Sequence, residues 1–265
     1  MTVYEVMIKA NECLIKGDSI SDRQKQNIIN MFLASISSND VAQRFYQGVR
    51  YPNNTDSTGN GKMYPLFFIP PYNNGKKYKT IMTVTPKTHI LSANMYELEI
   101  IRLLHLFEPN NTTVHNMVCK TLERLKTTCY GNNYCGQGEC FDASIVVLRF
   151  LSAAIPNEIN WMKKQIDNFH LHFAKKHRHW GVLWYYWLCL SELPAAIPEI
   201  IYYKNDLLKQ INRSCVMNSE HDKYAHPLCI CIVRNCLARL PEYEYIKECK
   251  PYISDKDNRL HFNMS

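Results

Sequence analysis

Four strongly apolar segments, each ending at a proline, place the tightest constraint on how this 265-residue chain can fold. The prolines are spaced 47, 38 and 47 residues apart, at Pro109, Pro156, Pro194 and Pro241. Seven residues before three of these prolines stands an arginine, which tryptophan replaces in the third segment. The residues at this position are Arg102, Arg149, Trp187 and Arg234. Because proline cannot continue a helix, each segment predicts a buried helix that stops at a fixed point.

An amphipathic helix is predicted after each proline. The first three cover about residues 112–130, 157–176 and 195–213, and a shorter one covers about 242–249. Two helices per period of ~40–47 residues are typical of helical-repeat proteins. The apolar helices should form an inner layer and the amphipathic helices an outer one, because a single hairpin cannot bury its apolar face alone. We therefore expect a mainly all-α fold of repeated α-hairpins, closed into an α/α toroid or left as a partial barrel.

The repeat period and the apolar inner helices of residues 92–250 resemble those of terpenoid cyclases, protein prenyltransferase β subunits and lanthipeptide cyclases. The resemblance implies a ring of inner helices around a central cavity. The resemblance indicates a fold and not a reaction, because proteins of one architecture can catalyse unrelated reactions.

The N-terminal part predicts a helical cap over residues 1–48. Apolar residues recur at helical spacing over 3–16 and stop at Gly17, which suits the end of a helix. Ser21 can cap a second helix that runs to about residue 36, and a third is predicted over about 38–48.

Residues 49–91 are predicted to form a loop and a β-hairpin flap before the repeat domain of 92–265. The segment is rich in Tyr, Pro, Asn and Gly, and Met63–Ile69 and Tyr78–Thr85 are short β-prone runs around a turn signal at 72–75. Neighbouring prolines favour a small edge hairpin over a central strand. A long segment of this kind commonly covers a binding site.

Charge and cysteine content narrow the class of protein. The net charge of +7 is spread along the chain, which favours anionic partners without a strong nucleic-acid signal. No apolar run approaches the ~20 residues of a membrane-spanning helix, and the first residues do not match a signal peptide. The eleven cysteines lack the spacing of a disulfide framework. We expect a cytoplasmic protein in which most thiols act as small buried apolar groups.

In a ring of hairpins, the loops that enter the inner helices would meet at one rim. These loops carry the candidate catalytic residues Glu139, Cys140, Asp142, His179 and His221. They also carry the candidate substrate contacts Tyr134, Trp180, Trp184 and His226. Three chemistries are compatible with this rim, and the sequence leaves the choice open.

The first is metal-assisted chemistry. Cys140, Asp142, His179 and His226 are acceptable zinc ligands, and the resemblance to protein prenyltransferases implies an Asp, a Cys and a His at such helix starts. The spacing matches no zinc finger, so buried thiols and loop histidines are the alternative interpretation. Zinc is thus a possible cofactor, and no other is indicated.

The second is a thiol nucleophile. Cys140 at a helix N-terminus would have its thiolate stabilised by the helix dipole, and a histidine from another loop could be its base. The segment from Gly138 to Pro156 is similar to the cysteine helix of transglutaminase-like proteins. That family continues with β-strands, whereas residues 157–176 predict a helix.

The third is acid–base chemistry in a cavity lined by aromatic rings. Glu139 and Asp142 lie three residues apart on one predicted helix face, and a carboxyl group in an apolar pocket has a raised pKa. We expect an enzyme of this or the metal-assisted kind, acting on a small apolar or isoprenoid-like substrate that carries an anionic group. A Cys140 acyltransferase and a non-catalytic repeat scaffold that binds a protein are the alternatives. The sequence does not indicate the oligomeric state.

The arginines in the apolar helices have two interpretations. A buried arginine must be paired or hydrogen-bonded, so Arg102, Arg149 and Arg234 could bridge carboxylates and helix-end carbonyls, or could form a cationic wall for a substrate. Their position near the proline end favours the structural role.

Overall fold

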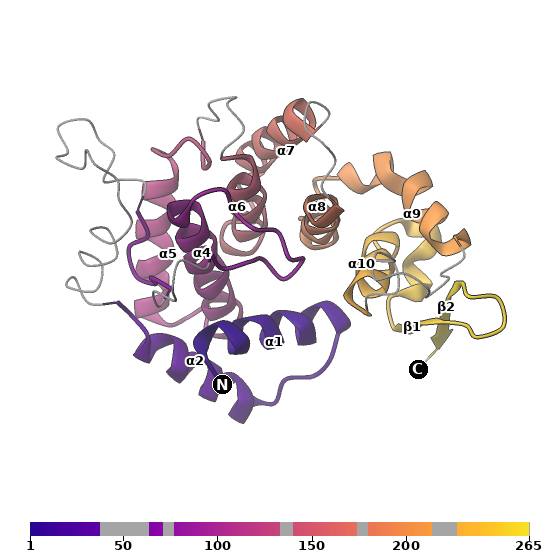
Figure 1. Ribbon diagram of the computed structural model, residues 1–265, viewed down its shortest axis with the longest axis horizontal. Coiled ribbons are helices and arrows are strands. Elements are labelled where there is room, and N and C mark those ends of the chain that lie inside the picture. The colour runs from indigo at the N-terminus through magenta and orange to yellow at the C-terminus, as the bar shows by residue number, and fades with distance from the viewer. Residues whose placement is uncertain (38–63, 71–76, 133–139, 174–179, 214–226, 265) are drawn as a thin grey trace.

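A computed structural model describes residues 1–37, 64–70, 77–132, 140–173, 180–213 and 227–264 of the chain. In these ranges the protein is mostly helical, with one two-stranded antiparallel sheet (Figure 1). The α-helices are α1 Val3–Lys16, α2 Asp22–Ala34, α4 His89–Phe107, α5 Thr112–Leu125, α6 Phe141–Ala154, α7 Ile159–Phe173, α8 Trp180–Glu192, α9 Lys204–Asn212 and α10 Pro227–Leu237. Two 3-10 helices are η2 Glu199–Tyr203 and η4 Pro241–Ile246, and the strands are β1 Cys249–Ile253 and β2 Leu260–Met264.

The first two helices are delimited by the residues that the sequence indicates. Thr2 caps α1 in a capping box with Glu5, and Gly17 ends it at φ 79°, a left-handed conformation that glycine adopts without strain. Ser21 caps α2 in a second capping box. Both predicted helices are confirmed, and the one predicted over 38–48 lies outside the described residues.

The four apolar helices that precede the prolines form an inner layer. In this layer α4 packs on α6, α6 on α8, and α8 on α10. Residues 90–104 of α4 are buried without interruption, as expected of a helix packed on more than one side. Helix α1 lies across one side of the layer and contacts both α4 and α10 (Figure 1).

Helices α6, α8 and α10 run parallel. Cys189 of α8 donates a hydrogen bond to the carbonyl of Ile145, and Ser152 donates one to the carbonyl of Glu192, so contacts advance in the same direction along α6 and α8. Cys236 donates to the carbonyl of Trp187, and Arg239 donates to that of Leu193, so the same holds for α8 and α10. Between these parallel helices the chain returns through α7 and then through η2 and α9.

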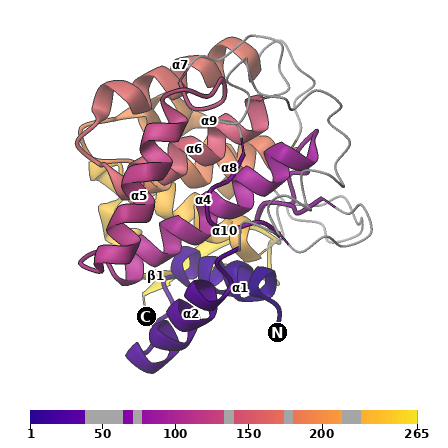
Figure 2. The ribbon, with the colours of Figure 1, turned by 90° about the vertical axis from the view of Figure 1, so that its left-hand side faces the viewer.

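The outer layer begins with the amphipathic helices α5 and α7, which pack on α4 and α6. In Figure 2 helix α5 faces the viewer and lies in front of α4. The third outer element starts as the 3-10 helix η2, because Pro194 and Pro198 come close together, and continues as α9. Helix α9 packs on α10.

The chain from residue 241 onward differs from the prediction. Instead of a helix over 242–249, it forms the 3-10 helix η4 and then the hairpin β1–β2, in which Cys249 pairs with Met264 and Ile253 with Leu260. Pro251 has no N–H to donate, which a two-stranded sheet tolerates because both strands are edges. Asn258 at φ 53° turns the chain between the strands.

The predicted β-hairpin flap is wrong where the structure describes it. Residues 64–70 and 77–85 form no strand, because their backbone groups have other partners. The N–H groups of Leu66, Phe67 and Phe68 all donate to Glu97 Oε2 of α4, at 2.7, 2.5 and 3.1 Å. Thr80 N–H donates to the carbonyl of Val84 in a tight turn. Helix α4 also begins at His89, inside the segment predicted as flap.

Candidate functional site

The predicted rim corresponds to the N-terminal ends of the inner helices, and those of α6, α8 and α10 share one side because the helices are parallel. Of the candidate residues, Cys140, Asp142 and Trp184 lie in the described part of the chain, and Trp180 begins α8. The candidates outside the described residues are Tyr134, Glu139, His179, His221 and His226.

Cys140 and Asp142 begin α6, as predicted. Cys140 is the N-cap residue, its side chain accepts no capping hydrogen bond, and it is only 7% exposed. Its Sγ lies 2.9 Å from Sγ of Cys129, in the turn that follows α5. Asp142 stands half-buried in the first helical turn. The sequence did not single out Cys129 as a neighbour of Cys140.

Trp184 is a core residue of α8. It is 3% exposed and meets Trp187 edge-on, with ring centroids 4.9 Å apart. Around it Tyr185 and Tyr186 are also buried. Its predicted contact with a substrate stays a prediction.

The described residues contain no group of three or more His, Cys, Asp and Glu side chains arranged to hold a metal ion. The zinc prediction includes His179 and His226, which lie outside those residues, so it stays a prediction. Other cysteines behave as the sequence indicates. Cys189, Cys229 and Cys236 are fully buried, and burial raises the pKa of each thiol.

A buried ion cluster occupies the contact of α1, α4, α6 and α8. Arg149, with no exposed surface, forms a two-pronged ion pair with Glu192, at 2.8 Å from Nε to Oε2 and 2.7 Å from Nη2 to Oε1. Its Nη1 donates to Asn11 at 2.8 Å and to both oxygens of Glu99 at 3.0 and 3.1 Å. The Tyr185 hydroxyl donates to Glu99 as well.

Arg102 completes this cluster. Its Nη2 lies 2.8 Å from Glu192 Oε2, and its Nη1 donates to Asn11 at 3.1 Å. Two arginines thus face two carboxylates. Burial alone would raise the pKa of Glu192, but Arg102 and Arg149 outweigh it and lower that pKa from 4.5 to about 2.

Arg234, in the fourth segment, has different partners. Its guanidinium donates to the carbonyls of Ile15 and Lys16 at 3.3 and 3.0 Å, at the C-terminal end of α1, and to that of Cys249 at 3.1 Å. A cation at this end also suits the helix dipole. The structural interpretation of Arg102, Arg149 and Arg234 is confirmed, because each guanidinium donates to carboxylates or to helix-end carbonyls.

A second buried cluster joins α4 to α5. Arg124 donates to Glu97 at 2.9 Å, to Asn94 at 2.5 Å and to the Tyr130 hydroxyl at 2.7 Å. Glu97 has no exposed surface, and burial raises its pKa although Arg124 and the N–H groups of residues 66–68 oppose that rise. This cluster fixes the chain entering α4. Nothing in the local sequence marks Arg124 as the partner of Glu97.

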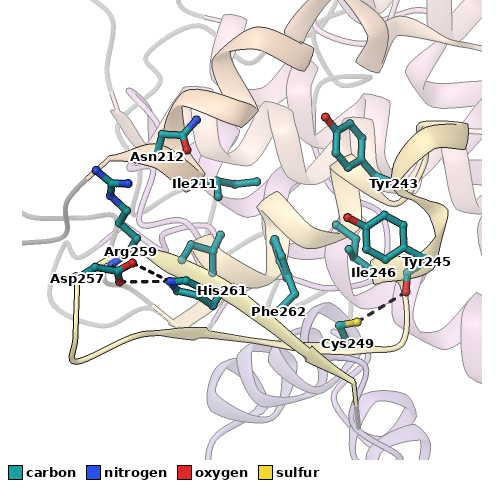
Figure 3. A pocket seen from close by; sticks show the side chains of 11 residues that line it. Ile211, Asn212, Tyr243, Tyr245, Ile246, Cys249, Asp257, Arg259, His261 and Phe262 are labelled. Carbon is teal, nitrogen blue, oxygen red and sulfur yellow. Dashed lines mark hydrogen bonds and ion pairs between the residues drawn. The ribbon is translucent and has the colours of Figure 1, made fainter.

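A groove with a volume of about 430 Å³ lies between α9, η4 and the hairpin (Figure 3). The residues that line it are Ile211, Asn212, Tyr243, Tyr245, Ile246, Cys249, Asp257, Arg259, Leu260, His261 and Phe262. Figure 3 shows Tyr243, Tyr245 and Phe262 toward one end and Asp257 and Arg259 at the other. The sequence does not indicate this groove, because residues 242–249 predict a helix in place of η4 and no strand is predicted after them.

The polar end of the groove contains an exposed acid–histidine pair. His261 Nε2 lies 3.0 Å from Asp257 Oδ2, and the hydrogen bond from His261 lowers the pKa of Asp257. Among the described residues that line the groove, the one cysteine is Cys249, and it lies away from this pair. In the hairpin His261 pairs with Tyr252 and Cys249 with Met264, three residue pairs away, which is roughly 10 Å along a strand.

Exposed apolar and aromatic side chains lie on this groove and on elements next to it. Ile201 and Tyr202 of η2 are 58% and 79% exposed, and Tyr245 of η4 is 72% exposed. The two 3-10 helices are neighbours, since Lys204 at the end of η2 forms a 2.5 Å ion pair with Glu242 of η4. Tyr252 of β1 is also exposed. We call Ile201, Tyr202, Tyr245 and Tyr252 the aromatic surface.

No protein-family model, curated protein or solved structure matches this chain. None of the helices in the described ranges combines the length and apolar character needed to cross a membrane.

Proposed function

We propose that the chain is a non-catalytic helical-repeat scaffold that binds a partner protein through its aromatic surface and the adjoining groove. The observation that carries the proposal is the exposure of Tyr245, which lines that groove, and of Ile201 and Tyr202 on the neighbouring 3-10 helix η2. Tyrosine is enriched at protein interfaces, where it supplies a large apolar area together with one hydroxyl group.

The packing inside the helix array favours a scaffold function rather than an enzyme with a central substrate cavity. We propose that α1, α4, α6, α8 and α10 form a ring, because each contacts the next and α1 contacts both α10 and α4. Where α1, α4, α6 and α8 meet, the space is filled by Arg149, Glu99 and Glu192 with their partners. A substrate would have to displace ion pairs that already satisfy one another, which costs several kcal/mol.

The shape of the groove indicates what the partner presents. One end is aromatic, formed by Tyr243, Tyr245 and Phe262, and the other carries Asp257 and Arg259. A protein segment with an apolar anchor residue, flanked by a polar or charged residue, fits both ends. Binding energy at such sites is concentrated in a few anchor contacts.

The test compares two variants with the wild-type chain. In Tyr202→Ser/Tyr245→Ser two exposed rings of the aromatic surface are lost, while Leu171→Ser removes a 54% exposed apolar side chain from α7 and is the matched control. Proteins retained from an extract of the source cells are identified by mass spectrometry, then purified for measurement of Kd. We expect at least a tenfold weaker Kd for the double variant and an unchanged Kd for Leu171→Ser. A retained set and Kd values that are identical for all three proteins would refute the proposal.

An enzyme at the rim stays a separate prediction, because Glu139, His179 and His221 lie outside the described residues. Metal analysis of the purified protein tests the zinc form of that prediction, and unchanged activity of Cys140→Ala would remove the nucleophile form. A cytoplasmic location is likewise a prediction, supported by the buried thiols.

A further inference from the structure

Two cysteines from separate turns meet at the N-terminal end of α6. Sγ of Cys129 and Sγ of Cys140 are 2.9 Å apart. Carbon atoms pack at about 3.5–4.0 Å, and sulfur is the larger atom, so this separation is already inside ordinary nonbonded contact. A small movement of the two side chains therefore suffices to reach bonding distance.

The backbone on the Cys129 side is held rigidly. Tyr130 is fully buried and its hydroxyl donates to Asn94 at 2.7 Å. The carbonyl of Gly131 accepts hydrogen bonds from Trp161 Nε1, at 2.7 Å, and from the Gln165 side chain. Cys129 thus belongs to a turn that is fixed to α4 on one side and to α7 on the other.

Gly131 shows how closely this turn is packed. A Cβ atom added there would lie 2.2 Å from the carbonyl oxygen of Leu125, which is closer than any side chain tolerates. The N–H of Gly131 also donates to Thr128 Oγ1 at 3.1 Å. Cys140, for its part, is fixed as the N-cap of α6, since its carbonyl accepts the N–H of Ser144 at 3.0 Å. Hydrogen bonds thus fix the backbone on both sides and hold the two sulfur atoms next to each other.

We propose that Cys129 and Cys140 form an intramolecular disulfide by exchange with glutathione disulfide. Cys129 is partly exposed, whereas Cys140 is 7% exposed, so Cys129 is the thiol that a small disulfide reaches first. Its thiolate attacks one sulfur of glutathione disulfide, which forms a mixed disulfide and releases one glutathione thiolate.

Cys140 then completes the exchange. Its thiolate attacks Sγ of Cys129, the bond to glutathione breaks, and the second glutathione thiolate leaves. The two protein thiols lose two electrons and two protons in total, the electrons reduce glutathione disulfide to two thiols, and the protons end on those thiols at neutral pH. The cross-link ties the turn after α5 to the N-cap residue of α6, and it is independent of the proposed binding function.

The linkage can be read directly from peptides. Cleavage after Lys126, Glu139 and Arg149 yields residues 127–139, which contain Cys129 and Cys135, and residues 140–149, which contain Cys140. The chain is incubated with glutathione disulfide, alkylated without reduction and digested. We expect one species that joins the two peptides and weighs two hydrogens less than their sum, and we expect reduction to separate it.

Three variants decide which thiols are joined. Cys135→Ser should keep the linked species, and Cys129→Ser and Cys140→Ser should each abolish it. Cys119→Ser, which removes an exposed cysteine on α5, is the matched control and should keep it. Oxidation should also raise the melting temperature of the Cys135→Ser chain by roughly 5–10 °C, as expected for a short closed loop.

Two results would overturn the proposal. One is alkylation of Cys129 and Cys140 as separate thiols after incubation with glutathione disulfide in a chain that keeps its helical circular dichroism. The other is loss of the linked species in Cys135→Ser together with its retention in Cys129→Ser, which would assign the bond to Cys135 and Cys140.

Discussion

Replacement of Arg149 by methionine should be among the most damaging single changes in the protein. Methionine keeps most of the side-chain volume but removes the guanidinium that serves Glu192, Glu99 and Asn11. Breaking one side of a buried ion pair typically costs 3–5 kcal/mol, because the remaining charge stays buried without its partner. Arg102 still contacts Glu192 at 2.8 Å, and the Glu192 side chain is 26% exposed. We therefore expect the free energy of unfolding to fall by about 3 kcal/mol at neutral pH, near the lower end of this range.

The pH dependence distinguishes a charge effect from a packing effect. In the folded wild type the pKa of Glu192 is about 2, below its ordinary value of 4.5. A lowered carboxyl pKa stabilises the fold above the unfolded value, and this contribution is lost as the pH falls from about 4.5 toward 2. The shift corresponds to about 3 kcal/mol before the partial exposure of Glu192 is taken into account. The destabilisation by Arg149→Met should therefore shrink steadily as the pH falls through this window.

Urea unfolding followed by circular dichroism at about pH 7 and pH 3 measures both quantities, provided that the slope with urea is unchanged by the substitution. Arg239→Met is the matched control, because Arg239 donates to the carbonyls of Leu193 and Pro194 and pairs with no carboxylate among the described residues. Its cost should be the same at both pH values. A loss below about 1 kcal/mol for Arg149→Met, or a loss of equal size at pH 7 and pH 3, would refute the reasoning.

Three further substitutions test other parts of the fold. Glu97→Ala leaves Arg124 and the N–H groups of residues 66–68 without their carboxylate. We therefore expect the free energy of unfolding in urea to fall by about 3 kcal/mol and the amide protons of residues 66–68 to exchange faster. Unchanged amide exchange would contradict this role. Gly131→Ala should lower the melting temperature by several degrees, because the new Cβ meets the carbonyl of Leu125. Gly17→Ala should lower the free energy of unfolding by only about 1 kcal/mol, because a Cβ there has room and only the left-handed φ of 79° opposes it. Equal destabilisation by Gly17→Ala and Gly131→Ala would contradict this reasoning.

The parts of the fold that the sequence predicts are those governed by local chemistry. Capping residues such as Ser21, the left-handed Gly17, and prolines at the ends of apolar segments act within a few residues, so their consequences are visible in the sequence. The structural role of the buried arginines was predictable for a related reason. A cation in an apolar helix requires partners, although the sequence does not say which.

The parts that the sequence does not predict depend on distant partners. Asn11 meets Arg149 across 138 residues, and no local pattern indicates that contact. Residues 66–68 have β-prone side chains, yet a carboxylate on α4 takes the N–H groups that a strand would use. The groove was missed for the same reason, since its walls come from α9, η4 and a hairpin whose second strand lies beyond the last predicted helix.

The one departure in the arginine pattern follows from the charge balance of the buried ion cluster. Arg102 and Arg149 from the first two repeats are balanced by Glu99 and by Glu192, which the third repeat supplies five residues after Trp187. An arginine at the position of Trp187, which is 3% exposed, would bring a third cation into a core where both carboxylates are already paired. The fourth repeat can keep its arginine because Arg234 turns to the carbonyl groups at the end of α1. The third repeat therefore supplies one of the two anions of the cluster, and its uncharged residue at position 187 keeps the net charge of this core at zero.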